Sequence, residues 1–252
     1  MKRTDYAKIA PRYDDNEVRL RIRQDEILAE HLARVPRRPF GVLDLACGSG
    51  NYLAAQTKAF REQDIRWYGL DASEDMLALA RTKNPGVELH RGRAEKLPFE
   101  AQQFDYVTVS FAFHHFEDKS TALDEMSRVL RDDGVARVVN IAPSEMRAWW
   151  VYRFFPEAFH EDEKRFWSHA LLYYELSCRG FEPRARIEYD LYRIPLTEVL
   201  ADVELRHVPP FAILTDAQYE RGLAEVREAL ARDLRGYVDT EIALLGCTAL
   251  KR

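Results

Sequence analysis

The sequence has few cysteines, and they lie far apart. Cys47, Cys178 and Cys247 are the only three in 252 residues, and no CxxC pair occurs. An odd number of widely spaced thiols suggests neither a disulfide framework nor a zinc knuckle. We therefore expect a cytoplasmic protein, in a reducing environment, without a metal site.

Long apolar runs and a basic surplus are also missing. No stretch approaches the roughly 20 apolar residues that a membrane-spanning helix needs, and no apolar run of a secretory signal follows the first basic residues. The formal charge is −5, from 37 basic and 42 acidic side chains. Proteins that bind nucleic acid through its phosphates usually carry an excess or a stripe of Lys and Arg. These absences predict that neither a membrane nor a nucleic acid is a partner.

Strand-like apolar runs alternate with helical patterns along most of the chain. The expected strands are 41–46, 65–70, 87–90, 104–111, 135–141, 184–192 and 240–249, and the expected helices are 16–33, 51–60, 73–82, 119–130, 168–178, 195–206 and 215–232. This alternation is typical of a doubly wound sheet with helices on both faces. We predict an α/β fold with a mostly parallel seven-stranded sheet, an N-terminal helical segment, and a helical insertion between the last two strands.

The chain shows no internal repeat and no low-complexity linker, so we expect one domain over residues 1–252. Its core is expected at 41–142, and region 143–252 is expected to complete the sheet and the substrate side. Aromatic side chains crowd the segment 149–167. That segment has two interpretations: a hydrophobic core or homodimer interface, or a lid over an apolar or aromatic acceptor.

A strand runs into a Gly-rich turn and then a helix at residues 42–51. Gly48 and Gly50 allow the backbone to approach a ligand closely, and the helix N-terminus beyond them favours a carboxylate. A dinucleotide fingerprint requires a third glycine, but Leu53 stands in its place. Asp44 precedes the turn and would repel a pyrophosphate, whereas it would attract an ammonium group. The pattern therefore predicts a cationic amino-acid-like ligand.

The stretch VLDLACGSGNY resembles the first motif of class I S-adenosylmethionine-dependent methyltransferases. Further motifs of that family follow in order: GLDAS at 69–73, RAEKLPF at 93–99, and FDYV at 104–107 through FHHF at 113–116. The segment 6–14 resembles the part that covers the cofactor, within residues 1–38. The nearest resemblance is to the ubiquinone/menaquinone-biosynthesis-like small-molecule subgroup, and it covers 1–142 well and the rest loosely.

This resemblance implies a Rossmann-like fold and S-adenosylmethionine as the cofactor. Asp71 would hold both ribose hydroxyls, because a carboxylate accepts two hydrogen bonds at once. Arg93 stands where many relatives carry Asp, so Glu95 or the backbone of Ala94 would contact the adenine. Ala46 replaces a glycine of the motif, which is a mild change in size. The cofactor contacts implied are Tyr13, Asp44, Ala46, Gly48, Gly50, Asp71, Ala72, Ala94, Glu95 and Ser110.

The implied reaction is in-line transfer of a methyl group to oxygen, nitrogen, sulfur or carbon of a small-molecule acceptor. His114 is the candidate catalytic residue. It either transfers a proton or lines the pocket. Two other functions stay open: a sensor or scaffold that binds the cofactor without turnover, and a nicotinamide-dinucleotide oxidoreductase.

Overall fold

The computed structural model describes residues 22–206 and 208–252. The strands are β1 (Phe40–Leu45), β2 (Ile65–Asp71), β3 (Glu88–Arg91), β4 (Phe104–Ser110), β5 (Leu130–Ile141), β6 (Phe181–Pro195) and β7 (Tyr237–Lys251). The α-helices are α2 (Glu26–Arg34), α3 (Asn51–Ala59), α4 (Glu74–Lys83), α5 (Lys119–Val129), α6 (Trp150–Phe154), α7 (Pro156–Arg165), α8 (His169–Ser177), α9 (Leu196–Glu204) and α10 (Asp216–Arg232). Short 3₁₀ helices lie at η3 (Phe113–His115), η4 (Pro143–Glu145) and η5 (Pro209–Ile213).

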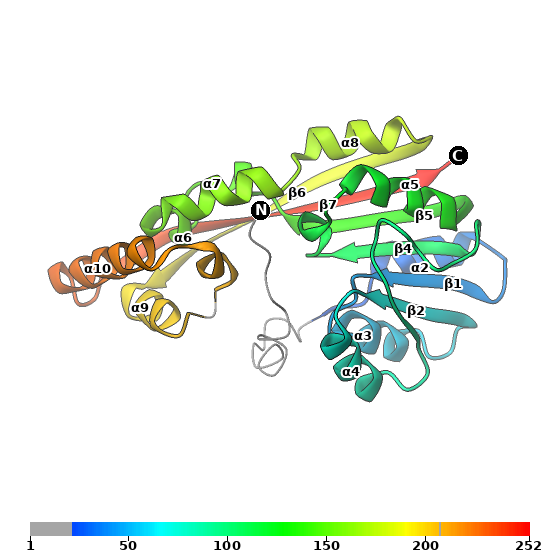
Figure 1. Cartoon of the computed structure of the whole chain (residues 1–252), viewed down its shortest axis with the longest axis horizontal. Helices are drawn as coiled ribbons and strands as arrows, with labels where there is room; N and C mark the ends of the chain where they lie inside the picture. Colours follow the sequence, from blue (N-terminus) through cyan, green and yellow to red (C-terminus); the bar gives the residue numbers. More distant parts are fainter. Residues whose placement is uncertain (1–21, 207) are drawn as a thin grey trace. The chain divides into compact units, whose positions relative to one another are not determined.

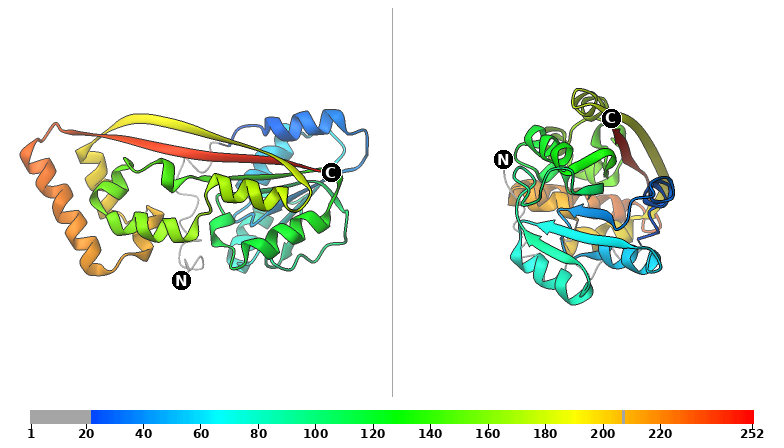
Figure 2. Two further views of the ribbon diagram at one scale, coloured as in Figure 1. Left: turned by 90° about the horizontal axis from the view of Figure 1, so that it is seen from above. Right: turned by 90° about the vertical axis from the view of Figure 1, so that its right-hand side faces the viewer.

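The seven strands form one sheet in the order β3-β2-β1-β4-β5-β7-β6 (Figure 1). The pairs β2–β3, β1–β2, β1–β4 and β4–β5 are parallel. β7 runs against β5, because the Ala142 N–H donates to the Ala243 carbonyl while the ammonium of Lys251 reaches the Leu130 carbonyl. Figure 2 shows β6 and β7 as two long neighbouring strands. The predicted doubly wound, mostly parallel sheet is confirmed, and α9 and α10 are the helical insertion between its last two strands.

Local sequence signals explain where several helices begin. The Ser73 hydroxyl accepts from the N–H of Met76 and caps α4. The Thr215 side chain and Gln218 form a capping box at α10, which satisfies two backbone donors at once. Gly180 takes a φ of +80° just after α8, the left-handed conformation in which a helix commonly ends.

The predicted boundaries of four elements were wrong. The helix expected at 16–33 begins only at Glu26 within the described residues, where Asp25 caps it. β5 begins at Leu130 and not at the expected residue 135, because Asp133 with a φ of +67° and a register shift against β4 absorb the irregularity without ending the strand. β6 and β7 are also longer than expected, at 15 residues each.

Helices α2, α3 and α4 pack with β1 and β2 in one apolar cluster, which includes Leu28, Phe40, Leu53, Trp67 and Leu77. All six residues of β1 are buried. Such complete burial requires layers on both sides of the strand. The sheet therefore presents only its strand ends, and the loops that follow them, near β1.

The described chain divides into two compact units. One comprises residues 22–140, 170–185 and 246–252, and the other comprises 141–169 and 186–245 without residue 207. β6 and β7 each run through both units. The expectation of a single domain over 1–252 stays a prediction.

Candidate functional site

The turn between β1 and α3 takes an unusual backbone conformation. Ala46, Gly48 and Gly50 have φ values of +61°, +54° and +77°. A Cβ on Gly50 would lie 2.4 Å from the Asn84 amide, whereas a Cβ on Gly48 would meet no atom within 4 Å. The packing against Asn84 therefore requires glycine at position 50. Position 48 instead borders open space on the side where a Cβ would point.

Ala46 replaces a glycine of the motif, and the sequence indicates only that the two residues are similar in size. The structure shows a second requirement, because this position takes a positive φ. A non-glycine residue in the left-handed region carries about 1–2 kcal/mol of strain. The turn therefore stores strain at the point where the strand ends.

Asp44 lies in β1 with 2% of its surface exposed. Burial, and secondarily the charge of Asp71, raise the pKa of its carboxyl to about 8. No residue in the described ranges pairs with this carboxylate by a hydrogen bond or an ion pair. A buried carboxylate without a partner is costly, so the site favours a cation beside it.

Asp71 ends β2 and holds the turn in place. Its Oδ2 accepts the N–H of Gly48 at 2.8 Å, and its Oδ1 accepts the N–H of Ser73 at 2.8 Å. Burial raises the pKa of Asp71, while these backbone hydrogen bonds act against that rise. Each carboxylate oxygen can accept two bonds, so each retains capacity for a ligand hydroxyl. Ala72 follows directly and is exposed.

The loop after β3 contains Ala94, which is buried, and Glu95. Oε1 of Glu95 accepts from the N–H groups of Glu117 and Asp118 at 2.8 and 3.3 Å. This carboxylate therefore connects its loop to the start of α5. Its role toward an adenine stays a prediction, as does that of the Ala94 backbone.

The ends of β4 and β5 bring further polar groups to the same edge of the sheet. Ser110 is half-buried, and Phe111 after it has a φ of +53° with 51% of its surface exposed. His114 lies on η3, and its Nδ1 is 3.3 Å from Nδ2 of Asn140 in β5. Asn140 was missed at the sequence level, although an amide in the apolar run VVNI was a usable signal.

A buried network supports the turn from below and was also missed. Asp25 accepts from the hydroxyls of Tyr52 and Tyr106 at 2.7 and 2.9 Å, and it forms an ion pair with Arg137. Burial raises the pKa of both tyrosines well above the usual value, so both stay hydrogen-bond donors. Tyr52 belongs to the first turn of α3, and the network therefore anchors that helix start.

Two sequence predictions concern other parts of the chain. Tyr13 lies outside the described residues. In the segment 149–167, Trp150, Phe155 and Phe159 are buried, and the Phe155 and Phe211 rings lie 4.7 Å apart. This segment therefore contributes core to the unit that contains it.

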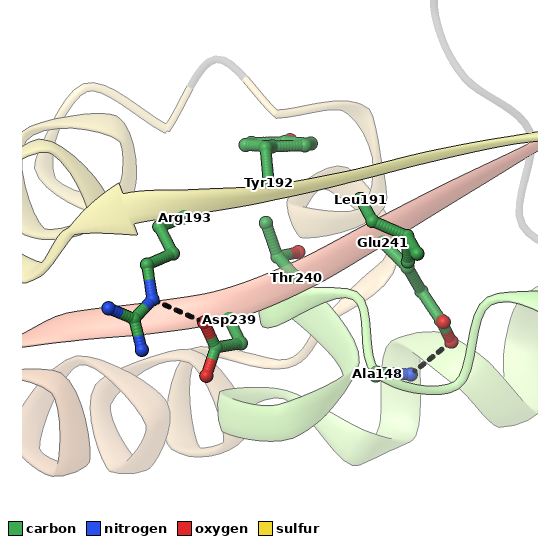
Figure 3. A pocket seen from close by; sticks show the side chains of 7 residues that line it. All are labelled: Ala148, Leu191, Tyr192, Arg193, Asp239, Thr240 and Glu241. Atoms are coloured by element: carbon green, nitrogen blue, oxygen red, sulfur yellow. Dashed lines mark hydrogen bonds and ion pairs between the residues drawn. The ribbon is translucent and has the colours of Figure 1, made fainter.

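A pocket of about 480 Å³ lies between residues of β6, β7 and Ala148, and Figure 3 shows the side chains that line it. Its charged groups already have partners: Arg193 pairs with Asp239 at 2.7 Å, and Glu241 accepts the N–H of Ala148 at 2.9 Å. It contains none of the predicted site residues. The edge formed by the ends of β1, β2, β4 and β5 is therefore the better candidate site, as expected for ligands of open α/β sheets.

Residues 22–206 and 208–252 contain no cluster of three His, Cys, Asp or Glu side chains that could hold a metal ion. Within the same ranges, no helix is long and apolar enough to cross a membrane.

Comparisons with known proteins point to one class of domain. Residues 42–134 match the family model described as a methyltransferase domain. Demethylmenaquinone methyltransferases are similar over part of the chain: that of Chlorobaculum parvum is 39% identical over 98 residues, 39% of each protein. That of Bacillus licheniformis is 32% identical over 147 residues, 56% of this chain and 62% of the relative. The chain thus matches between about two fifths and three fifths of these relatives' length.

Solved structures share the fold over most of the chain. A putative methyltransferase from an antibiotic biosynthesis pathway of Anabaena variabilis has a TM-score of 0.64 at 22% identity, covering 90% of this chain and 98% of that one. A putative methyltransferase from Bacillus halodurans has a TM-score of 0.61 at 21% identity, covering 90% and 99%. At these identities the likeness concerns the fold.

Replacing Ala46 with glycine is expected to stabilise the protein by about 0.5–1 kcal/mol. The substitution removes the left-handed strain but adds freedom to the unfolded chain, which offsets part of the gain. Urea unfolding measures the difference. Ala54→Gly in α3 is the matched control and should destabilise by about 1 kcal/mol. A loss of stability in Ala46→Gly would show that the turn carries no strain.

Replacing Asp44 with asparagine is expected to change how stability depends on pH. The folded-state pKa of Asp44 is raised from 3.8 to about 8, so the folded wild type holds a proton that the unfolded chain releases. Wild-type stability then falls as pH rises from about 4 to about 8, by up to about 1.4 kcal/mol per unit, and Asp44→Asn lacks this decline. Urea unfolding across that range checks it, with Asp64→Asn on the surface as control. Parallel wild-type and Asp44→Asn profiles would contradict it.

Proposed function

We propose, from the methyltransferase domain at residues 42–134 and the class I methyltransferase fold around it, that this protein transfers a methyl group from S-adenosylmethionine to a small molecule. The observation that carries the proposal is the buried carboxyl group of Asp44 at the Gly-rich turn, which has no hydrogen-bond or ion-pair partner among residues 22–206 and 208–252. A ligand with an ammonium group supplies the cation that this carboxylate lacks.

The residues present fit that cofactor. Asp44 would bind the ammonium, and the open space above Gly48 would admit the chain of the amino acid. Asp71 would accept from the ribose hydroxyls with the lone pairs that Gly48 and Ser73 leave available. When bound, S-adenosylmethionine supplies a methyl group already activated on a sulfonium. The protein then has to orient an acceptor behind that methyl and exclude water.

The acceptor is proposed to be apolar and aromatic, of the quinol type. Two observations support this class. The relatives named above carry the name demethylmenaquinone methyltransferase. Phe111 is also exposed, in a strained conformation, directly after β4. Strained residues persist only where the surrounding structure holds them, and they cluster at active sites and ligand-binding sites. An aromatic ring at this position would contact a flat apolar acceptor.

Release of S-adenosylhomocysteine from a panel of quinol, phenol, amine and thiol acceptors tests the proposal. Turnover of the quinol or phenol supports the proposed acceptor class. Calorimetry with S-adenosylmethionine and with a nicotinamide dinucleotide separates the cofactors. Binding of S-adenosylmethionine without turnover of any acceptor would favour a sensor or scaffold, and binding of the dinucleotide alone would overturn the assignment.

Asp71→Ala is expected to weaken S-adenosylmethionine binding by about 1–3 kcal/mol, roughly 5-fold to 150-fold, because it removes a charged acceptor. Asp71→Asn keeps one acceptor oxygen, so its affinity for S-adenosylmethionine should lie between those of wild type and Asp71→Ala. Asp75→Ala, on the exposed first turn of α4, is the control and should bind like wild type. Calorimetry measures the three affinities, with thermal unfolding to confirm that each variant is folded. Wild-type affinity in Asp71→Ala would remove the ribose assignment.

His114 is proposed to donate a hydrogen bond to the acceptor. With the Asn140 amide donating to Nδ1, the neutral ring carries its proton on Nε2 and has no lone pair there to accept one. This geometry favours the pocket-lining role over direct proton abstraction.

His114→Ala is therefore expected to lower kcat by less than about 30-fold, the value of one or two hydrogen bonds. A general base contributes about 10²–10⁴-fold. His114→Gln, which retains a donor, should recover part of the loss, and cofactor affinity should not change. Steady-state kinetics across pH provide the measurement. A loss above 100-fold, together with a vanished acidic limb of the pH profile, would identify a base.

Two further assignments stay predictions. The cytoplasmic location rests on cysteine usage, and the absence of nucleic acid partners rests on net charge. We also propose a homodimer.

A further inference from the structure

β6 is the outer strand of the sheet, and its register against β7 shows which backbone groups point outward. The N–H of Leu196 donates to the carbonyl of Gly236, and the N–H of Arg252 donates to the carbonyl of Gly180. Both pairs of residue numbers have the same sum, 432, and both strands have 15 residues. The two strands are thus antiparallel, and their register shows no net shift between these two pairs.

In this register the even-numbered residues of β6 exchange hydrogen bonds with β7. The odd-numbered residues direct their N–H and C=O groups to the free edge. Pro183 and Pro195 both occupy odd positions, where a missing N–H costs the sheet nothing, as is usual for proline on an edge strand. Residues 184–193 are exposed except for half-buried Ile187, so the part of the chain that the structure describes leaves this edge uncovered.

The side chains of β6 divide into two faces. The even-numbered positions carry charge in the order Arg184, Arg186, Glu188, Asp190. The odd-numbered positions are apolar: Pro183, Ala185, Ile187, Tyr189 and Leu191. Tyr189 and Leu191 are 54% and 72% exposed. A long exposed edge with an apolar face is a surface on which another strand can add.

We propose that two copies of this chain pair antiparallel along β6, about a two-fold axis at Ile187. In that register Arg186 of each copy faces Glu188 of the other, and Arg184 faces Asp190. On the opposite face Ala185 meets Tyr189, Pro183 meets Leu191, and Ile187 meets its own equivalent. The arrangement is isologous, as a two-fold dimer requires.

The charge order selects this register and no neighbouring one. An axis at Arg186 or Glu188 places that side chain against its own copy, and an axis at Ala185 or Tyr189 opposes like charges. Charged residues on an edge strand often prevent pairing; here they prevent every shifted pairing and favour the one at Ile187. Opposite charges directly across an antiparallel pair are worth about 0.2–1 kcal/mol each.

These charges are also available to a partner. Arg186 and Glu188 contact each other only at 3.6 Å, with side chains 82% and 68% exposed. By contrast, the charges at the two ends of the strand have close partners within the chain: Glu182 with Arg252 and Arg193 with Asp239. Among the described residues, the four charges on the part of β6 that the two-fold axis would pair thus make only this one long and exposed contact. This inference does not depend on the proposed reaction.

Charge reversal tests the pairing in the full-length protein, with mass measured by light scattering during size exclusion. Wild type is expected to be a dimer at micromolar concentration. Arg186→Glu and Glu188→Arg each place like charges together twice, so each should raise the dimer dissociation constant at least about tenfold. The double variant R186E/E188R restores opposite charges and should dimerise like wild type. Arg61→Glu, at a side chain 74% exposed on another surface, is the control and should change nothing.

Mixing the two single variants provides a second test. Arg186→Glu with Glu188→Arg should assemble into a heterodimer, because both contacts between unlike copies are then attractive, while each variant alone stays monomeric. Ile187→Pro should also be a folded monomer, since it removes an outward N–H that β7 does not use. A monomeric wild type, or a dimer indifferent to the single reversals and to their combination, would overturn the proposal.

Discussion

The conformation of the site depends on how two acidic side chains at adjacent strand ends share the available donors. Asp71 takes the N–H of Gly48 and that of Ser73. The hydrogen bond from Gly48 holds the turn after β1 in its left-handed conformation and fixes the start of α3. Asp44, buried one strand away, receives none of these donors, and its pKa rises to about 8. The same arrangement that stabilises the turn therefore leaves a carboxylate that favours a cationic ligand.

A buried network of hydrogen bonds and an ion pair supports the turn from below. Asp25 joins α2, α3, β4 and β5 by accepting from Tyr52 and Tyr106 and pairing with Arg137. Breaking such a buried network at one member leaves the others unsatisfied, which is costly. A site built on regular elements and supported in this way keeps its geometry. The strained Ala46 and Phe111 are held by these surroundings.

The order of the strands separates the two proposed parts of the site. β2 and β1 contribute Asp71 and Asp44, the proposed cofactor side. β4 and β5, on the other side of β1, contribute His114 and Asn140, the proposed acceptor side. The strand order reverses between β1 and β4, and ligands of open α/β sheets bind at such a reversal. The topology thus places the proposed cofactor side and the proposed acceptor side next to each other along one edge of the sheet.

Local sequence patterns determined the order of the elements and several residues of the candidate site. Element order, the caps at Ser73 and Thr215, the Gly-rich turn, and the positions of Asp44 and Asp71 follow from signals within a few residues, because capping, turns and burial periodicity are local properties. The tertiary structure alone decided the contact of Asn140 with His114, the convergence on Asp25, the continuity of β5 through Asp133, and the outward edge of β6. Each depends on which distant segments become neighbours in the sheet, and long-range pairing leaves no short-range mark in the sequence.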